Sequence, residues 1–218
     1  MIVSFLRHGS TAWNEQGRMQ GLQDVPLSAR GRDEVRAWRV STELTRGVQW
    51  VSSPLRRAVE TAQLLSGTTP RCESALIEMD WGEWEGFRLD ELRARFGAEF
   101  ARMETLGLDF RPPGGESPRD VLYRVHRWLA CAAVEGKPVV AVSHNGVLRI
   151  VLAAATGWDM TGKPPVRLQP GTLHRFAVAH DGTISIVECN VPLAPGAAVD
   201  APSAVTVGIP TGVSPAKL

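Results

Sequence analysis

Two of the five histidines stand one residue after apolar runs of strand length. His8 lies in Phe5-Leu-Arg-His-Gly9, and His144 lies in Val142-Ser-His-Asn-Gly146. Parallel strands buried on both faces read as continuous hydrophobic runs, and ligands of such sheets bind beyond the carboxyl ends of the strands. If the two strands are neighbours, both imidazoles lie at one edge of the sheet. Zinc would need a further ligand at suitable spacing, and because no HxH or HExxH motif occurs we predict no metal site.

Three arginines are candidates to bind an anion. Arg7 directly precedes His8, and Arg56 and Arg57 follow Pro54 at a predicted helix start. Guanidinium groups present planar forks of donors that suit phosphate oxygens, and the first turn of a helix offers unpaired backbone N–H groups. Arg56 and Arg57 lie on opposite flanks of the apolar stripe of this helix, so helical phase does not choose between them.

An acidic, tryptophan-rich segment runs from Glu78 to Gly86. Its carboxylates belong to Glu78, Asp80, Glu83 and Glu85. A carboxyl group beside apolar and aromatic neighbours can have a raised pKa and stay protonated near neutrality. Such a group could give a proton to a leaving alkoxide. The pattern by itself leaves open which of the four would do so.

The elements that would position these groups alternate between strands and helices. The predicted strands are residues 2–6, 49–51, 71–77 and 138–143, followed by a hairpin of 173–179 and 184–187 around an Asp-Gly turn. The predicted helices are residues 28–45, 54–66, 117–135 and 147–155, with 88–108 helical in two pieces. Ser53-Pro54 is typical of a helix start, with a hydroxyl N-cap and a proline at the first helical position. The alternation predicts an α/β fold: a three-layer sandwich with a mostly parallel central sheet flanked by helices.

We expect one domain over residues 1–190, with a small helical and loop cap inserted at about 87–116. Residues 191–218 are rich in Pro, Ala and Gly and have few large apolar side chains, which predicts a flexible or extended arm that could bind a partner. An apolar stripe in the cap is more typical of core than of a ligand pocket. It consists of Phe87, Phe96, Phe100, Leu106 and Phe110.

Composition narrows the class of protein. A formal net charge of +1 over 218 residues gives no field that would favour nucleic acid or an anionic membrane. The cysteines, Cys72, Cys131 and Cys189, are far apart, fit neither a zinc spacing nor a redox motif, and are expected to be small buried thiols. No signal peptide or membrane span is evident. These features predict a cytoplasmic protein.

Five separated motifs resemble, in order, those of the histidine phosphatase superfamily, which includes the cofactor-dependent phosphoglycerate mutases. The first is Leu6-Arg-His-Gly9 with Thr11, Trp13 and Asn14, continued by Arg18-Met-Gln-Gly21, Asp24, Pro26-Leu-Ser28 and Gly31. The others are Ser52-Ser-Pro-Leu-Arg-Arg-Ala-Val-Glu-Thr-Ala62, Glu78–Gly86, Gly114-Gly-Glu-Ser117 and Val142-Ser-His-Asn-Gly146. The resemblance covers about residues 2–190.

The resemblance implies a phosphohistidine mechanism with His8 as the nucleophile. Arg7, Arg57 and His144 would surround the phosphoryl oxygens, where charge builds in the transition state. The family's Leu-x-Arg-Ala pattern selects Arg57 over Arg56, and its Leu-x-Glu pattern selects Glu78 as proton donor, with Glu83 as the second choice. Further implied contacts are Asn14 and Asn145 to the phosphate and Gln20 and Gly21 to the substrate. Two departures stand out: Ser10 replaces a frequent Glu or Gln, and Asn145 replaces a frequent Gly.

The segment between Glu78 and Ser117 is shorter than in dedicated mutases, and its Pro-Pro-Gly-Gly-Glu-Ser turn resembles the phosphatase branch, including α-ribazole phosphatase-like proteins. We therefore expect a metal-independent phosphomonoesterase that needs no cofactor and hydrolyses small phosphorylated metabolites. The alternatives are a cofactor-dependent phosphoglycerate mutase and a non-catalytic phosphate-binding module. We expect no nucleic-acid or membrane partner, and the sequence is compatible with a homodimer.

Overall fold

The computed structural model describes residues 1–41 and 46–193. Within them a single six-stranded sheet has the order β3-β2-β4-β1-β5-β6. The strands are β1 (Ile2–Arg7), β2 (Gln49–Ser52), β3 (Arg71–Cys72), β4 (Val139–Ser143), β5 (Thr172–Val178) and β6 (Ile184–Pro192). β1 to β4 pair in parallel, whereas β5 and β6 add an antiparallel hairpin at the β1 side. The α/β fold with a mostly parallel sheet is confirmed.

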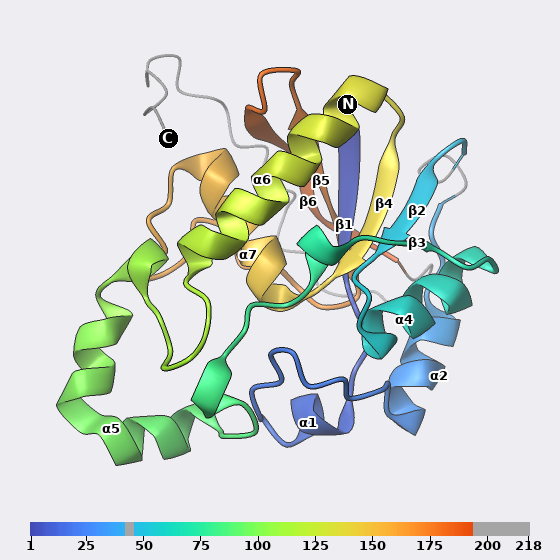
Figure 1. Cartoon of the computed structure of the whole chain (residues 1–218). Coiled ribbons are helices and arrows are strands. Elements are labelled where there is room, and N and C mark those ends of the chain that lie inside the picture. The colour runs from blue at the N-terminus through green and yellow to red at the C-terminus, as the bar shows by residue number, and fades with distance from the viewer. Residues whose placement is uncertain (42–45, 194–218) are drawn as a thin grey trace.

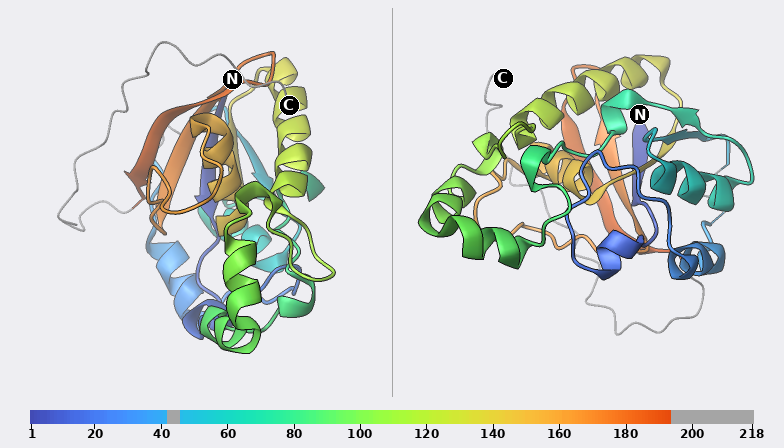
Figure 2. Two further views of the ribbon diagram at one scale, coloured as in Figure 1. Left: turned by 90° about the vertical axis from the view of Figure 1, so that its left-hand side faces the viewer. Right: turned by 60° about the horizontal axis from the view of Figure 1, so that its bottom comes forward.

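Helices cover both faces of this sheet. The α-helices are α1 (Ala12–Glu15), α2 (Ala29–Ala37), α4 (Arg56–Ser66), α5 (Leu89–Glu104), α6 (Pro118–Glu135) and α7 (Asn145–Thr156). α6 and α7 pack together on one face, and α4 covers the other face with α2 beside it. β1 runs downward from the N-terminus in Figure 1, so the carboxyl ends of the parallel strands point to the lower edge, where α1 and α5 lie. The right-hand view of Figure 2 brings that edge forward.

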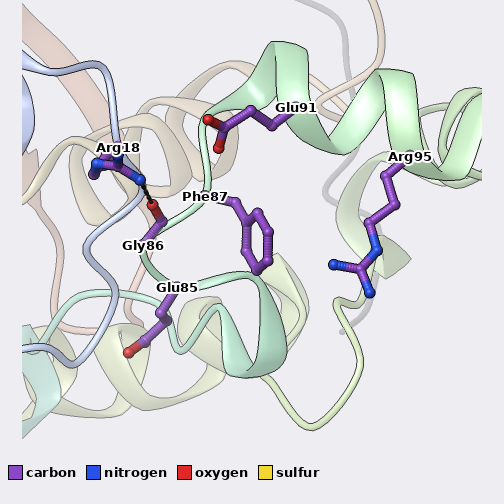
Figure 3. Close-up of a pocket in the computed structure, with 6 residues that line it drawn as sticks. All are labelled: Arg18, Glu85, Gly86, Phe87, Glu91 and Arg95. Atoms are coloured by element: carbon purple, nitrogen blue, oxygen red, sulfur yellow. Dashed lines mark hydrogen bonds between the residues drawn. The ribbon is translucent and has the colours of Figure 1, made fainter.

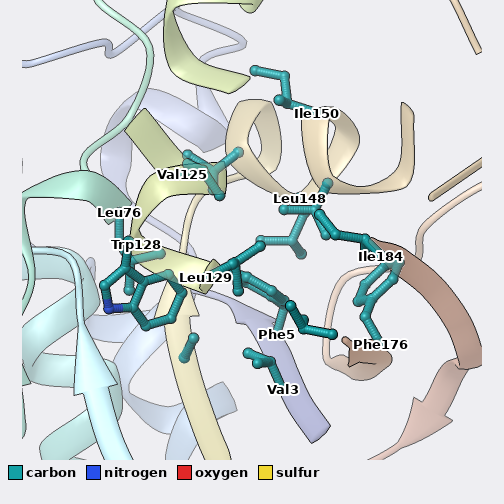
Figure 4. Close-up of a cluster of buried hydrophobic side chains, with 14 of the residues drawn as sticks. Val3, Phe5, Leu76, Val125, Trp128, Leu129, Leu148, Ile150, Phe176 and Ile184 are labelled. Carbon is teal, nitrogen blue, oxygen red and sulfur yellow. The ribbon is translucent and has the colours of Figure 1, made fainter. Parts of the chain in front are cut away.

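The core follows from strands that are apolar on both faces. In β1, Val3 and Phe5 belong to the cluster beneath α6 and α7, whereas Leu6 belongs to the cluster beneath α4. The Phe5 ring meets Trp128 and Phe176 edge-on, with ring centres 6.4 and 6.0 Å apart (Figure 4). Burial of such aromatic side chains dominates core energetics. The contacts of Phe5 therefore stabilise β1 in its place between β4 and β5.

Both ends of α6 and the C-terminal end of α4 follow local sequence signals. In α6, Ser117 is the N-cap, Asp120 completes a capping box, Pro118 opens the helix and Gly136 ends it in a left-handed conformation. Gly67 ends α4 in the same way. These boundaries agree with the sequence prediction.

Several predicted elements differ in extent. α2 ends at Ala37, where residue 38 turns extended, and residues 42–45 of the predicted helix lie outside the described residues. The predicted strand 71–77 is extended only over β3, because the Glu73 carboxylate accepts a hydrogen bond from the Ala75 N–H and caps a 3₁₀ turn over Ser74–Leu76. α7 begins at Asn145, two residues before its predicted start.

The chain near residue 190 and the cysteines also differ from expectation. β6 runs through Pro192, past the boundary predicted at residue 190, and Leu193 is buried. Residues 194–218 of the predicted arm lie outside the described residues. Cys72 and Cys131 are exposed rather than buried, and Cys189 is partly buried, because the first lies on a two-residue strand and the second on the outer side of α6. In the described part of the chain, no helix combines the length and hydropathy needed to cross a bilayer.

A small hydrophobic cluster joins the predicted cap (residues 87–116) to the acidic segment that precedes it. α5 bends at Gly97, whose φ of 45° is left-handed, as the predicted break requires. Trp84, Leu92 and Phe100 are buried together, and the Trp84 and Phe100 ring centres lie 5.0 Å apart. The phenylalanines of the predicted stripe belong to this cluster or pack against it, whereas Leu106 is exposed.

Candidate active site

His8 and His144 lie side by side at the carboxyl edge of the sheet. β1 and β4 are paired so that Arg7 opposes Ser143, and the His8 N–H continues the ladder by donating to the Ser143 carbonyl at 3.0 Å. Their imidazole ring centres are 5.1 Å apart, and both side chains are buried. The predicted adjacency of the two histidines therefore follows directly from the strand register.

The surroundings of His8 fix its tautomer. Its Nδ1 lies 2.7 Å from the Gly9 carbonyl oxygen, and because a carbonyl only accepts, Nδ1 carries the proton and Nε2 holds the lone pair. Burial lowers the pKa of His8 well below its usual value, and the positive charges of Arg7 and Arg57 lower it further. His8 is thus a neutral imidazole with its nucleophilic nitrogen free.

Gly9 allows the tight turn that places this carbonyl. A Cβ at Gly9 would lie 2.5 Å from a methyl group of Val35 on α2, so a larger residue would push the turn away from the helix. The Gly9 N–H donates to the Thr61 hydroxyl at 3.0 Å, and that hydroxyl donates to the Arg57 carbonyl. The turn is therefore held between α2 and α4.

His144 has the opposite tautomer. The Arg57 Nε–H donates to its Nδ1 at 3.3 Å, so the proton resides on Nε2, which donates to the Ser53 hydroxyl at 2.7 Å. Burial lowers the pKa of His144 well below its usual value, with His8 and the nearby arginines as further causes. Ser53 is therefore not the helix N-cap that the sequence predicts. α4 begins at Arg56, and its first N–H is capped by the Asp24 carboxylate at 2.7 Å.

The structure distinguishes Arg57 from Arg56. Arg57 is completely buried, and its Nη1 and Nη2 donate to the carbonyls of Gln23 and Gly21, each at 2.8 Å. Arg56 is exposed. Arg57 is thus the arginine of this helix that reaches the histidines.

Arg7 provides free donors at the same edge. It is the last residue of β1 and is partly buried. In the described part of the chain its guanidinium has no hydrogen bond or ion pair. Burial lowers the pKa of Arg7, and the nearby Glu78 raises it. A partly desolvated cation with unused donors is suited to bind a phosphate oxygen.

Glu78 is the acid that meets the histidine-bearing loop. Its Oε1 accepts from the Met79 N–H at 2.9 Å and its Oε2 accepts from the Gly146 N–H in the first turn of α7 at 3.3 Å. Burial raises the pKa of Glu78 despite these N–H donors and the positive charges of Arg57 and Arg7. A carboxyl group with a raised pKa at the first turn of α7, close to Arg57 and Arg7, can act as a general acid.

The other acids of this segment are either hydrogen-bonded elsewhere or exposed. Asp80 accepts from the Gly82 N–H at 2.7 Å, Glu83 is exposed, and Glu85 accepts from the Leu22 N–H at 2.7 Å. The geometry therefore favours Glu78 over Glu83 as the proton donor.

Arg124 on α6 braces the loop that carries Glu78. It donates to the carbonyls of Ala75 and Glu78 and forms two hydrogen bonds with the Glu116 carboxylate, at 3.2 and 3.0 Å. Glu116 Oε2 also accepts from the Asp80 N–H at 3.2 Å. Sequence reasoning missed this role of Arg124, because its partners lie 8 to 49 residues away and no local pattern marks them.

Two of the four further predicted contact residues, Asn14 and Gln20, are hydrogen-bonded to Thr11. The Asn14 Oδ1 accepts from the Thr11 N–H at 3.2 Å, which leaves the amide N–H groups of Asn14 for a ligand. Gln20 is buried and its Oε1 accepts from the Thr11 hydroxyl at 2.9 Å. The Gly21 carbonyl is already used by Arg57. Asn145, the first residue of α7, is exposed.

A pocket of about 570 Å³ lies between the segment around Arg18 and the start of the cap (Figure 3). Its lining residues are Arg18, Glu85, Gly86, Phe87, Glu91 and Arg95. Arg18 donates to the Gly86 carbonyl at 2.6 Å, and the Arg95 guanidinium lies 5.6 Å from the centre of the Phe87 ring. In the described residues, no three His, Cys, Asp or Glu side chains converge as a metal site would require.

Comparison with known proteins identifies the family. Residues 3–191 match the model of the histidine phosphatase superfamily (branch 1). The chain belongs to the histidine phosphatase superfamily. The strand-end His8 and His144, the arginines and the acidic segment all lie within the region that matches this superfamily.

Relatives within the superfamily have two kinds of named activity. The chain is 32% identical over 196 residues to a 2,3-bisphosphoglycerate-dependent phosphoglycerate mutase from Gloeobacter violaceus, covering 85% of this chain and 90% of that protein. It is 35% identical over 172 residues to a glucosyl-3-phosphoglycerate phosphatase from Mycolicibacterium vanbaalenii, covering 73% and 76%. A mycobacterial glucosyl-3-phosphoglycerate phosphatase solved with VO3 has a TM-score of 0.72 at 28% identity, covering 89% and 99%. Phosphatase and mutase activities are therefore both represented among its relatives.

Proposed function

We propose that this chain is a metal-independent phosphomonoesterase that hydrolyses small phosphorylated metabolites through a phosphohistidine. The observation that carries the proposal is the His8 tautomer: Nδ1–H donates to the Gly9 carbonyl, and the Nε2 lone pair remains for attack. The lowered pKa of His8 keeps this lone pair unprotonated in mildly acidic and neutral solution. A neutral nucleophile beside cationic donors is suited to phosphoryl transfer.

In the first step, His8 Nε2 attacks phosphorus and the bond from phosphorus to the ester oxygen breaks. The leaving alkoxide takes the proton of the Glu78 carboxyl group, which becomes a carboxylate. Arg7 and Arg57 stabilise the charge on the phosphoryl oxygens, and His144 lies beside them. Asn14 offers neutral N–H donors.

In the second step, water attacks the phosphorus of phosphohistidine. The Glu78 carboxylate accepts a proton from this water, and the electron pair of the P–N bond returns to Nε2. Inorganic phosphate leaves, and Glu78 is protonated again for the next cycle. The two steps use the same acid in opposite directions.

Rapid quenching tests the covalent step. Turnover of a ³²P-labelled phosphomonoester should leave an acid-labile, base-stable phosphate on His8, and His8→Ala should abolish both label and turnover. Label on another residue would contradict the assignment. A panel of sugar phosphates and phosphoglycerate esters, ranked by kcat/KM, would then define the substrate class.

A phosphoglycerate mutase is the second candidate, because the relatives include proteins of that name at up to 32% identity over most of the chain. Both kinds of relative act, by name, on phosphoglycerates. Interconversion of 3- and 2-phosphoglycerate that is stimulated by 2,3-bisphosphoglycerate and exceeds phosphate release would establish the mutase. A parent protein that binds phosphorylated ligands without turnover, and an equally tight His8→Ala variant, would instead indicate a non-catalytic module.

A further inference from the structure

Glu85 uses both of its carboxylate oxygens on a distant segment of the chain. Its Oε1 accepts from the Leu22 N–H at 2.7 Å, and its Oε2 accepts from the Gln23 Nε2 at 2.9 Å. These partners precede Glu85 by 63 and 62 residues. The carboxylate therefore joins the acidic segment to the loop 21–23.

The same loop holds the guanidinium of Arg57 from its other side. The carbonyls of Gly21 and Gln23 accept from Nη2 and Nη1 of Arg57, each at 2.8 Å. The peptide groups of residues 21–23 thus present an N–H to Glu85 and two carbonyls to Arg57. The third nitrogen of the Arg57 guanidinium, Nε, donates to Nδ1 of His144.

Gly21 makes this close approach feasible. Its φ of +53° is left-handed, and a Cβ at this position would lie 1.8 Å from Oε1 of Glu85. Only glycine satisfies both the backbone conformation and the space taken by the carboxylate. The loop is therefore shaped around the Glu85 side chain.

We propose that Glu85 is a positioning residue that fixes the buried guanidinium of Arg57 through loop 21–23. The inference rests on the proposed function of Arg57 as a phosphate-binding group. Without Glu85, the Leu22 N–H and the Gln23 amide lose their acceptor, and the two carbonyls that orient Arg57 lose their support. Burial lowers the pKa of Arg57, and the negative charges of Glu78, Asp24 and Glu85, in that order, oppose this effect.

The arrangement also relates the pocket in Figure 3 to the histidines. Glu85 and Gly86 line that pocket, and Glu85 is one hydrogen bond away from the loop that orients Arg57. A change in the acidic segment is therefore transmitted to the phosphate-binding arginine along a defined chain of contacts.

Three variants test the proposal, with orthovanadate as the probe and tryptophan fluorescence as the binding signal. Glu85→Ala should weaken vanadate binding on the order of 10- to 100-fold, because small displacements of a positioning group are costly in such sites. Glu85→Gln should lie between Glu85→Ala and the parent, since its amide oxygen can still accept from the Leu22 N–H but its NH₂ cannot accept from Gln23. The control is Glu99→Ala, which removes an exposed carboxylate from α5 and should bind vanadate as the parent does.

A double-mutant cycle with Arg57→Ala separates positioning from a general structural effect. If Glu85 acts through Arg57, adding Glu85→Ala to Arg57→Ala should weaken vanadate binding less than two-fold further. Losses that multiply independently, or a Glu85→Ala variant that binds vanadate like the parent, would overturn the proposal. If Glu85→Ala does not fold, the same cycle is run with Glu85→Gln.

Vanadate binding also keeps this test distinct from that of the proposed function. A parent protein that binds vanadate but releases no phosphate from any ester would contradict the hydrolase. The cycle would still report whether Glu85 positions Arg57. With an active parent, kcat/KM for p-nitrophenyl phosphate should fall by the same factor as vanadate affinity in Glu85→Ala.

Discussion

Gly146, in the first turn of α7, leaves room for the carboxylate that is proposed to be the general acid. A Cβ placed on Gly146 would lie 2.4 Å from Oε1 of Glu78 and 3.2 Å from its Cδ. Gly146→Ala would therefore push the Glu78 carboxyl group away while leaving the histidines and arginines in place. The substitution tests the role of Glu78 without changing its chemistry.

The size of the effect follows from this distance. Ordinary contact begins near 3.4 Å, so the carboxyl group must retreat by about 1 Å, a displacement that can cost on the order of 100-fold in rate. Alanine in a helix is up to about 1 kcal/mol more favourable than glycine. The weakened Gly146 N–H to Glu78 hydrogen bond costs about 1 kcal/mol. We therefore expect stability to stay nearly constant, with Tm changing by less than about 4 °C.

Two substrates make the assay specific for proton donation. p-Nitrophenolate leaves readily without a proton, whereas the alkoxide of glycerol phosphate needs one. Gly146→Ala should lower kcat for glycerol phosphate on the order of 100-fold and should affect p-nitrophenyl phosphate much less. Glu78→Gln should show the same difference between the two substrates.

Either of two results would contradict the role of Glu78 as proton donor. One is a Gly146→Ala protein that hydrolyses glycerol phosphate at the parental rate. The other is an equal loss on both substrates, which would mean that the substitution disturbs the nucleophile or the phosphate-binding groups. Thermal unfolding of the same samples excludes a trivial loss of folded protein.

Three further predictions concern pH and the bracing of the acid. The pKa of Glu78 is raised and that of His8 is lowered, so kcat/KM should stay constant on the acidic side of neutrality and fall as rising pH removes the Glu78 proton. In a pH–rate profile, Glu78→Gln should abolish this fall at alkaline pH. Burial lowers the pKa of His174 from 6.5 to about 4, so the contribution of the neutral imidazole to stability is fully present above pH 6.5. About 3 kcal/mol of that contribution is lost as the pH falls to 4. Urea unfolding at pH 7, 5.5 and 4 measures this loss, and a free energy of unfolding that does not change with pH would contradict it. Arg124→Ala should destabilise the fold by about 3 kcal/mol, because it leaves the half-buried Glu116 carboxylate without its cationic partner. It should also slow glycerol phosphate hydrolysis by a larger factor than p-nitrophenyl phosphate hydrolysis. An equal fold-loss on the two esters would contradict the bracing of Glu78.

The parts of this site that could be predicted from sequence are those that local pattern encodes. His8 and His144 each follow a continuous apolar run, and buried parallel strands carry that signature without reference to the rest of the chain. Their common edge then follows from the parallel order of β1 and β4. The capping box at Ser117 is equally local, since the groups that form it are three residues apart.

The missed parts depend on contacts between distant segments. Ser53 has the local signature of a helix N-cap, but its hydroxyl accepts from His144, 91 residues later, and Asp24 caps the helix instead. The choice of Arg57 over Arg56 likewise depends on two carbonyls more than 30 residues away. Helical phase carries no information about either partner, so only the resemblance or the fold could decide between the two arginines.

The register of β1 and β4 has a consequence for how this chain can change. Neighbouring strands lie about 4.8 Å apart, and the two imidazole centres are 5.1 Å apart, so the spacing of the histidine pair is that of the peptide ladder itself. Side-chain substitutions in α5 or elsewhere in the cap leave this spacing untouched. The relative placement of the two histidines therefore depends on the backbone pairing of β1 with β4 and not on the side chains of residues 87–116.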